Sequence, residues 1–399
     1  MPGGATKLAH APGPRYHALD SLRAIAMLLG LWLHASIPYT PFGPKFWAVH
    51  EDTNSEPLLF SLMFIHSFRM QLFFMMAGFF AHLLVSRRGT RRFIRNRSLR
   101  VLAPFAIAMV TIGPALLVLW ILGEIVQPPN TERPQPSGFF IPTFHLWFLE
   151  YLLFMYAGML LLSPLARFLG IARLAPLSAW LIRAPLLPIV LAVPAAGLLW
   201  LIPGWESGPL KGGIVPEPGP LAYYSFFFAF GWVLFSRRDL LDTLARWWIP
   251  QLAIALVVVT PVFLYAHGRL DNLDGAPVPL QLDLIGHASA ALLTCLLTIA
   301  FTGMFLRCFN RPSRWGRYIS DASYWLYLVH LPIQIVASML LLALPVDGHF
   351  KFLLVLLVTT PLMLLVYHYA VRYTPIGWML NGKRHHPTHE AVLECSTAT

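Results

Sequence analysis

The chain has 399 residues, of which 57% are hydrophobic and 12% are charged. Soluble globular proteins carry about 25% charged residues, so this composition excludes a soluble protein and indicates a surface that mostly faces lipid. The formal net charge of +11 would suit either nucleic acid or an anionic membrane surface. The basic residues follow the ends of apolar segments, which favours the lipid bilayer as partner, and we expect no nucleic acid.

Ten apolar stretches approach or exceed the roughly 20 residues that a bilayer-spanning helix needs. They lack the period-2 alternation of membrane strands. The sequence therefore predicts an all-α polytopic membrane protein, a bundle of about ten transmembrane helices. We expect tails at 1–18 and 372–399 and one transmembrane domain at 19–371. The predicted spans are 19–40, 58–85, 101–123, 143–164, 185–203, 220–236, 249–267, 282–306, 318–343 and 351–371.

The connections between these spans differ in charge from one side of the membrane to the other. One side, with the two tails, holds 22 Lys and Arg residues, and the other holds 5. Basic residues concentrate in cytoplasmic loops, so both termini are expected in the cytoplasm. No small-residue cleavage site follows the first apolar run, which is therefore expected to remain as a span. The outer connections at 127–137 and 204–220 are rich in Pro and Gly.

The first span carries two basic side chains, Arg23 and His34, eleven residues apart. Three helical turns, about 16 Å, separate them on nearly the same face. Asp20 lies near this face at the inner edge, and Gly30 lies between. Ionisable groups inside a bilayer cost at least ~2.5 kcal/mol on insertion scales and are usually functional. The alternatives are a hydrogen-bonded structural histidine and an arginine that extends to the cytoplasm.

The second span carries His66 and Arg69 in the segment FIHSFRMQLFF at 64–74. Arg69 is expected near the middle of the membrane, where its side chain cannot easily reach water. A structural ion pair is the alternative, and Glu150 in the fourth span is the intramembrane acid that could supply it.

A cluster of arginines at 87–100 ends with Arg97 and Arg100, just before the third span. Most of these arginines are expected to act only as a topology signal, in a cytoplasmic loop. Two arginines at positions i and i+3 share a helix face and can bind phosphates bidentately. The phosphates of coenzyme A would suit this pair.

Polar side chains also occur in the fourth span, at His145 and Glu150, and in the ninth, at Ser323 and His330. Structural hydrogen bonding is the alternative for each. The histidines lie on different helices without metal-ligand spacing, so no metal site is expected. A histidine and arginine core that opens to a basic cytoplasmic rim suits an anionic donor inside and an acceptor outside. An anion transporter would have the same layout.

Several of these motifs together resemble the acyltransferase-3 family of membrane acyltransferases. They are Arg23-x10-His34, Arg97-x-x-Arg100, FFMMAGFF at 73–80 and SYWLYLVHLP at 323–332. The resemblance implies a catalytic role for His34, Arg23 and Arg69, and acyl-CoA binding by Arg97 and Arg100. It implies no tightly bound cofactor, and acyl-CoA, either succinyl-CoA or acetyl-CoA, as donor substrate. Possible supporting residues are Asp20, His66, His145, Glu150, Ser323 and His330.

The expected function is that of a membrane O-acyltransferase in the bacterial inner membrane. By resemblance, it moves an acyl group, preferably succinyl, from acyl-CoA in the cytoplasm to hydroxyls of a periplasmic glucan, with other glucan biosynthesis proteins as candidate partners. One alternative is an O-acetyltransferase acting on another envelope glycan, such as lipopolysaccharide or peptidoglycan. A transporter of the glycan or acyl group is another, although such proteins usually show internal repeats, which we do not see here. The intact arginines and His34 count against a scaffold.

Overall fold

The computed structural model describes residues 16–128, 141–168, 170, 180, 185–202, 213–238, 241–271, 277–311 and 313–382. These residues are mainly helical, and the β-structure among them is one isolated bridge between Pro142 and Gly213. Within these described ranges, eight helical stretches are long and apolar enough to cross a membrane. The prediction of an all-α polytopic membrane protein is confirmed. The tails at 1–15 and 383–399 and most of the outer connections at 127–137 and 204–220 lie outside the described residues.

Each predicted span has a helical counterpart in the structure. The shortest is α7 (Leu187–Leu199), whose 13 residues extend about 20 Å against a hydrocarbon core of about 30 Å. The other counterparts are α1 (His17–Ser36), α3 (Glu56–Arg97), α4 (Ala103–Val126), α5 (Trp147–Phe168), α8 (Pro218–Ser236), α10 (Trp248–Ile254) with η6 (Ala255–Val259) and α11 (Thr260–Asp271), α12 (Leu280–Cys308), α13 (Arg314–Leu341), and α14 (Gly348–Val366) with η7 (Tyr367–Val371).

Short helical elements connect these helices or flank them. They are η1 (Ile37–Tyr39), α2 (Gly43–Phe46), η2 (Ser98–Leu102), η3 (Phe144–Leu146), α9 (Leu241–Arg246) and α15 (Pro375–Asn381). The last of these, α15, lies in the region predicted as a tail. The Asn381 side-chain amide donates to the backbone oxygen of Asp321 on α13, at 2.7 Å. The beginning of the predicted tail is therefore a helix docked on the bundle.

The arginine cluster at 87–100 is helical, and its prediction as a loop was wrong. Helix α3 has 42 residues and continues to Arg97, and the π-helical turn η2 joins it to α4. The direction changes at Gly89, which has φ 74° and ψ 166°. Glycine adopts this positive φ without the steric cost that a Cβ atom would bring. Arginine favours helices, which agrees with the helical conformation of the cluster.

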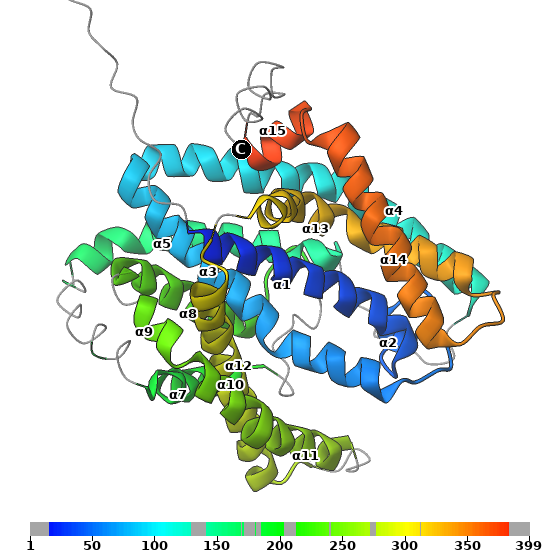
Figure 1. The fold of residues 1–399 in the computed structure, drawn as a ribbon, viewed down its shortest axis with the longest axis horizontal. Coiled ribbons are helices and arrows are strands. Elements are labelled where there is room, and N and C mark those ends of the chain that lie inside the picture. Colours follow the sequence, from blue (N-terminus) through cyan, green and yellow to red (C-terminus); the bar gives the residue numbers. More distant parts are fainter. Residues whose placement is uncertain are drawn as a thin grey trace, which may run out of the picture.

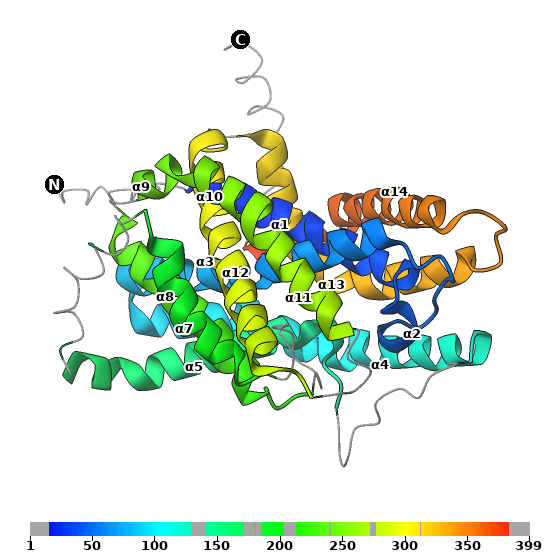
Figure 2. The same cartoon turned by 90° about the horizontal axis from the view of Figure 1, so that it is seen from below.

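Two groups of helices make up the described bundle. Figure 1 shows α1, α3 and α13 through the centre, and α7 to α12 gathered to one side. Helix α1 packs against α3, α12 and α13, so the first span is central. The groups meet chiefly where α3 packs on α8, for example through Phe74 and Tyr224, with ring centroids 4.7 Å apart. Figure 2, turned by 90°, shows α12 crossing behind α10 and α11.

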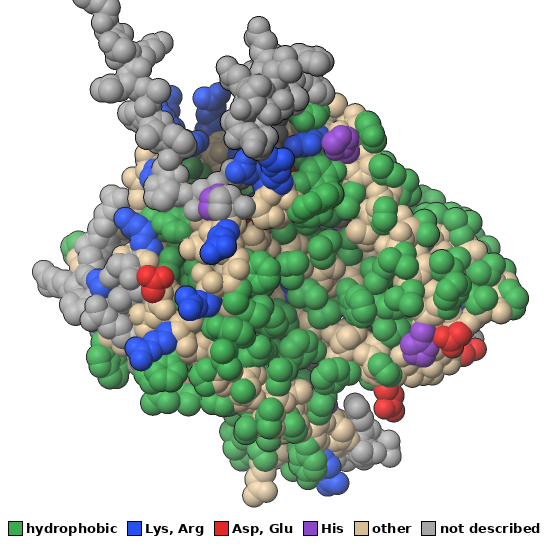
Figure 3. All heavy atoms as spheres, in the orientation of Figure 1, with side chains coloured by type: hydrophobic (Ala, Val, Ile, Leu, Met, Phe, Trp, Pro, Cys, Tyr) green, Lys and Arg blue, Asp and Glu red, His purple; other side chains and the backbone are tan. Residues whose placement is uncertain are grey.

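Charged side chains gather at opposite ends of the face in Figure 3. Most of the Lys and Arg residues lie toward its left and upper side, while acidic side chains mark its right end, where α13 turns into α14. At that right end the buried Lys351 donates to Glu51 at 2.7 Å. The separation agrees with the uneven distribution of charge predicted for the two sides of the membrane.

Candidate active site

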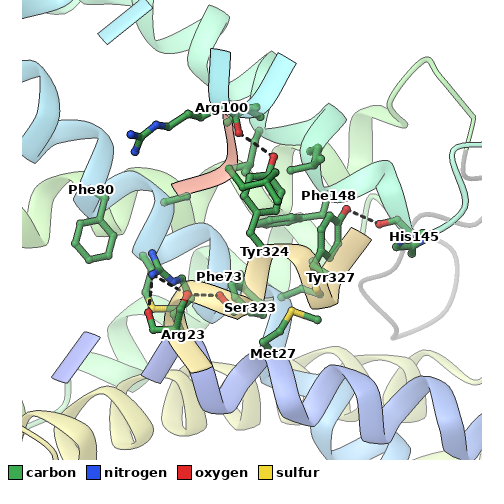
Figure 4. Close-up of a pocket in the computed structure, with 18 of the residues that line it drawn as sticks. Arg23, Met27, Phe73, Phe80, Arg100, His145, Phe148, Ser323, Tyr324 and Tyr327 are labelled. Atoms are coloured by element: carbon green, nitrogen blue, oxygen red, sulfur yellow. Dashed lines mark hydrogen bonds between the residues drawn. The ribbon is translucent and has the colours of Figure 1, made fainter. Parts of the chain in front are cut away.

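A cavity of ≈ 420 Å³ lies among α1, α3, η2, α5, α13 and α15. It brings together most of the site residues predicted from separate stretches of sequence. These are Arg23, His34, Arg69, Arg97, Arg100, His145, Ser323 and His330. The structure thus unites the histidines and arginines, which the sequence places on five helical segments. Figure 4 shows the part of this cavity between Arg23 and His145.

Three imidazole rings cluster at one end of the cavity. The centroid of His330 is 5.0 Å from that of His34 and 5.1 Å from that of His145. His34 comes from the last turn of α1, His330 from the middle of α13, and His145 from η3. Imidazole side chains from three helical elements therefore lie next to one another in one cluster.

Backbone contacts define which nitrogens of this cluster carry hydrogen. The Nε2 of His145 lies 3.1 Å from the carbonyl oxygen of Leu328, which can only accept, so Nε2 donates. The Nδ1 of His330 likewise donates to the carbonyl of Tyr327 at 2.8 Å. Among the described residues, the other ring nitrogens, His145 Nδ1 and His330 Nε2, have no hydrogen-bond partner. Neutral rings would thus present two lone pairs, which suit acceptance of a proton from a hydroxyl group.

Trp47 closes the cluster on the side of the connection between α1 and α3. Its ring stacks near His34, at 6.2 Å between centroids and 25° between planes, and only 1% of its surface is exposed. Its segment is held to the end of α4 because His50 N donates to Gln127 Oε1 and Gln127 Nε2 donates to His50 O. His34 is therefore covered on the side of Trp47.

Arg69 lies beside this cluster, packed against α1. It is 8% exposed, and its guanidinium occupies the space that a Cβ atom on Gly30 would need. The absence of a side chain at Gly30 lets the guanidinium approach the backbone of α1 one turn before His34. Within the described residues Arg69 forms no ion pair, and its buried Nε has no hydrogen-bond partner. The proposed pair with Glu150 is absent there.

The opposite end of the cavity is basic and partly exposed. Arg23 donates to Ser320 Oγ at 2.6 Å and lies 3.6 Å from Asp20. The Arg97 guanidinium lies over the rings of Phe93 and Tyr156, at 5.4 and 5.1 Å. These aromatic contacts orient a cation without neutralising it, so its charge stays available to an anion.

One face of α13 connects the two ends. Ser320 accepts from Arg23, and the hydroxyls of Tyr324 and Tyr327 donate to the backbone oxygens of Arg100 and His145, both at 2.8 Å (Figure 4). His330 follows, and Gln334 Nε2 donates to Leu31 O of α1 at 3.0 Å. Sequence reasoning did not select Ser320 or Gln334. The spacing of three and four residues along α13 is the signal that would have found them.

The remaining predicted residues play smaller parts in this geometry. Asp20, His66 and Glu150 do not line the cavity. Asp20 is near Arg23, and Glu150 is buried on α5, with 2% of its surface exposed. Ser323 lines the cavity, but its hydroxyl donates to Ser320 O in its own helix at 2.8 Å. Trp47 and Tyr156 contribute to the site although the sequence pattern did not single them out.

Comparison with known proteins defines the class. The acyltransferase-3 family model, described as an acyltransferase domain, matches residues 16–368. The chain therefore belongs to this family and is a multi-pass membrane acyltransferase. It is similar to glucans biosynthesis protein C of Salmonella gallinarum, with 26% identity over 94% of this chain and 97% of the relative. The protein of the same name from Salmonella paratyphi B is 25% identical over the same shares. No solved structure matches the chain.

Proposed function

We propose that this protein transfers a succinyl group from succinyl-CoA to hydroxyl groups of a periplasmic glucan, in the bacterial inner membrane. The observation that carries the proposal is one cavity with a histidine cluster at one end and a pair of arginines at the other. The name of the relatives, glucans biosynthesis protein C, supports a glucan as the acceptor.

The arginine end suits the donor. Arg97 and Arg100 are partly exposed and would bind the phosphates of coenzyme A through charge-assisted hydrogen bonds. Arg23 lies about three helical turns, ~16 Å, from His34, which is too far to contact a carbonyl at that histidine. We therefore assign Arg23, held by Ser320, to donor binding rather than to the reacting carbonyl. The pantetheine arm would run along α1 toward His34.

The histidine end suits the chemistry. His34 would remove the proton of a glucan hydroxyl as its oxygen attacks the thioester carbonyl. The new carbon–oxygen bond forms, the carbon–sulfur bond breaks, and the proton passes from His34 to the departing CoA sulfur. The His330 ring, 5.0 Å from that of His34 and with its Nε2 unpartnered among the described residues, would orient His34 for the transfer. A route through an acyl group on His34 would use the same cluster.

One experiment tests this proposal in the host cell. The gene is deleted, and the periplasmic glucans are compared by mass spectrometry after complementation with wild type or His34→Ala. We expect a mass increment of one succinyl group that wild type restores and the variant does not. Immunodetection of both proteins in the membrane controls for insertion. Glucans that stay unchanged on deletion would exclude this acceptor, and an acetyl-sized loss from another glycan would support the O-acetyltransferase alternative.

A further inference from the structure

The cation beside the reacting histidine is buried without an anion. Arg69 is 8% exposed, and within the described residues it has no acidic partner. A charge inside a bilayer is costly unless it is paired. The same protein pairs another buried cation: Lys351 donates to Glu51 at 2.7 Å and to Leu342 O at 3.2 Å. The contrast indicates that the partner of Arg69 is not among the described residues, and that a bound anion could take this place.

The position of Arg69 defines how far that partner lies from the reacting carbonyl. Its guanidinium packs against Gly30, which precedes His34 by one helical turn, about 6 Å along α1. In a succinyl group three carbon–carbon bonds separate the thioester carbon from the carboxylate carbon, about 4 Å when extended. A carbonyl held at His34 therefore brings the carboxylate within hydrogen-bonding reach of Arg69. An acetyl group has no atom that reaches it.

We propose that Arg69 is the binding residue for the free carboxylate of a dicarboxylic acyl group, and so selects ω-carboxyacyl donors over uncharged ones. This inference rests on the proposed acyl-CoA donor. The planar guanidinium can bind a carboxylate with two parallel hydrogen bonds, and its buried Nε is free for one of them. Tyr327 lines the same cavity as Arg69.

Donor binding tests this assignment without knowledge of the acceptor. Calorimetric titration of the purified full chain with succinyl-CoA and butyryl-CoA compares two four-carbon thioesters that differ in the terminal carboxylate. Wild type should bind succinyl-CoA about tenfold to a hundredfold more tightly, the contribution of a charge-assisted hydrogen bond. Arg69→Gln should lose this preference and still bind butyryl-CoA. Arg69→Lys, which keeps the charge without the planar fork, should fall between them.

Control measurements distinguish a specific loss of carboxylate binding from a loss of folding and from a wrong donor. Arg269→Gln, a charge removal at an exposed position on α11, should leave the preference intact. Thermal unfolding of each variant verifies the fold. Equal affinity of wild type for both thioesters would overturn the assignment. So would an equal loss of both in a folded Arg69→Gln, because Arg69 would then act on the thioester itself. If wild type bound no CoA thioester at all, the proposed donor would fail and this inference with it.

Discussion

The two ends of the cavity differ in how exposed their charged and polar side chains are and in which groups hold them. At the arginine end the side chains are partly exposed, and Arg23 and Arg97 are held by a hydroxyl and by aromatic rings. At the histidine end His145 and His330 are held by backbone carbonyls, and all three rings keep an unpartnered nitrogen among the described residues. The first arrangement suits a soluble anionic donor that enters and leaves. The second suits bond making in a place that excludes water.

The largest effect on transfer is expected from Gly30→Ala, a substitution beside the histidine end of the cavity. The new methyl group would occupy the position of the Arg69 guanidinium, which must move away from the proposed carboxylate subsite. Succinyl transfer, measured by mass spectrometry of glucans made by isolated membranes, should fall about a hundredfold, the contribution of a charge-assisted hydrogen bond. The new methyl group meets the flexible end of the Arg69 side chain and not a backbone atom, so the protein should still fold. Gly158→Ala, which meets nothing within 4 Å, is the control. Unchanged transfer by Gly30→Ala would show that the position of Arg69 does not matter.

A somewhat smaller effect is expected from His330→Phe, which keeps a ring beside His34 but removes its nitrogens. The proton acceptor would lose its neighbour, so kcat should fall at least about tenfold while the donor KM stays the same. The assay is CoA release over a range of succinyl-CoA concentrations, which gives both kcat and the donor KM. A rise in KM without a fall in kcat would place His330 in donor binding instead.

A substitution at the arginine end should change the donor KM and leave kcat almost unchanged, the opposite of His330→Phe. Arg97→Ala removes a cation that lies over Phe93 and Tyr156, so the KM for succinyl-CoA should rise about tenfold with little change in kcat. Arg238→Ala, which removes a similar cation–ring contact at Phe235 outside the cavity, serves as control. A lower kcat at unchanged KM would contradict the division between the two ends.

Tyr324→Phe should have a smaller effect of the same kind. The hydroxyl donates to Arg100 O at 2.8 Å, and its loss would loosen η2 without removing a charge. One neutral hydrogen bond corresponds to a rise of about threefold in the donor KM. Tyr265→Phe on α11, an exposed tyrosine, is the matched control. If the donor KM matched wild type, the link between α13 and η2 would be without consequence for binding.

The smallest effect is expected far from both ends, at Asp347, which caps α14. The hydrogen bonds from the His349 ring and backbone lower the pKa of this exposed carboxyl below its ordinary value. Such a carboxyl stabilises the fold above its unfolded pKa, and this contribution disappears as pH falls through the folded pKa. Asp347→Asn should therefore lower the Tm slightly at pH 7, converge with wild type in acid, and leave transfer unchanged. A difference in Tm that persists in acid would exclude this origin.

The sequence by itself determined the class of fold and singled out most of the charged residues that line the candidate site. Runs of apolar residues specify membrane helices because the bilayer leaves backbone groups no other partners. Helical spacing placed Arg23 and His34 on one face, and the cost of intramembrane charge singled out Arg69. These are local properties, and they can be evaluated along the chain without knowing which helices are neighbours.

Only the tertiary structure decided which of these residues meet. It placed His330 and His145 beside His34, formed no ion pair between the described Glu150 and Arg69, and turned part of the predicted tail into α15 at the cavity. It also made a helix of the arginine cluster at 87–100. The physical reason is that contacts between helices depend on how they pack and cross, and that small details such as the missing side chain at Gly30 determine where a long side chain can lie.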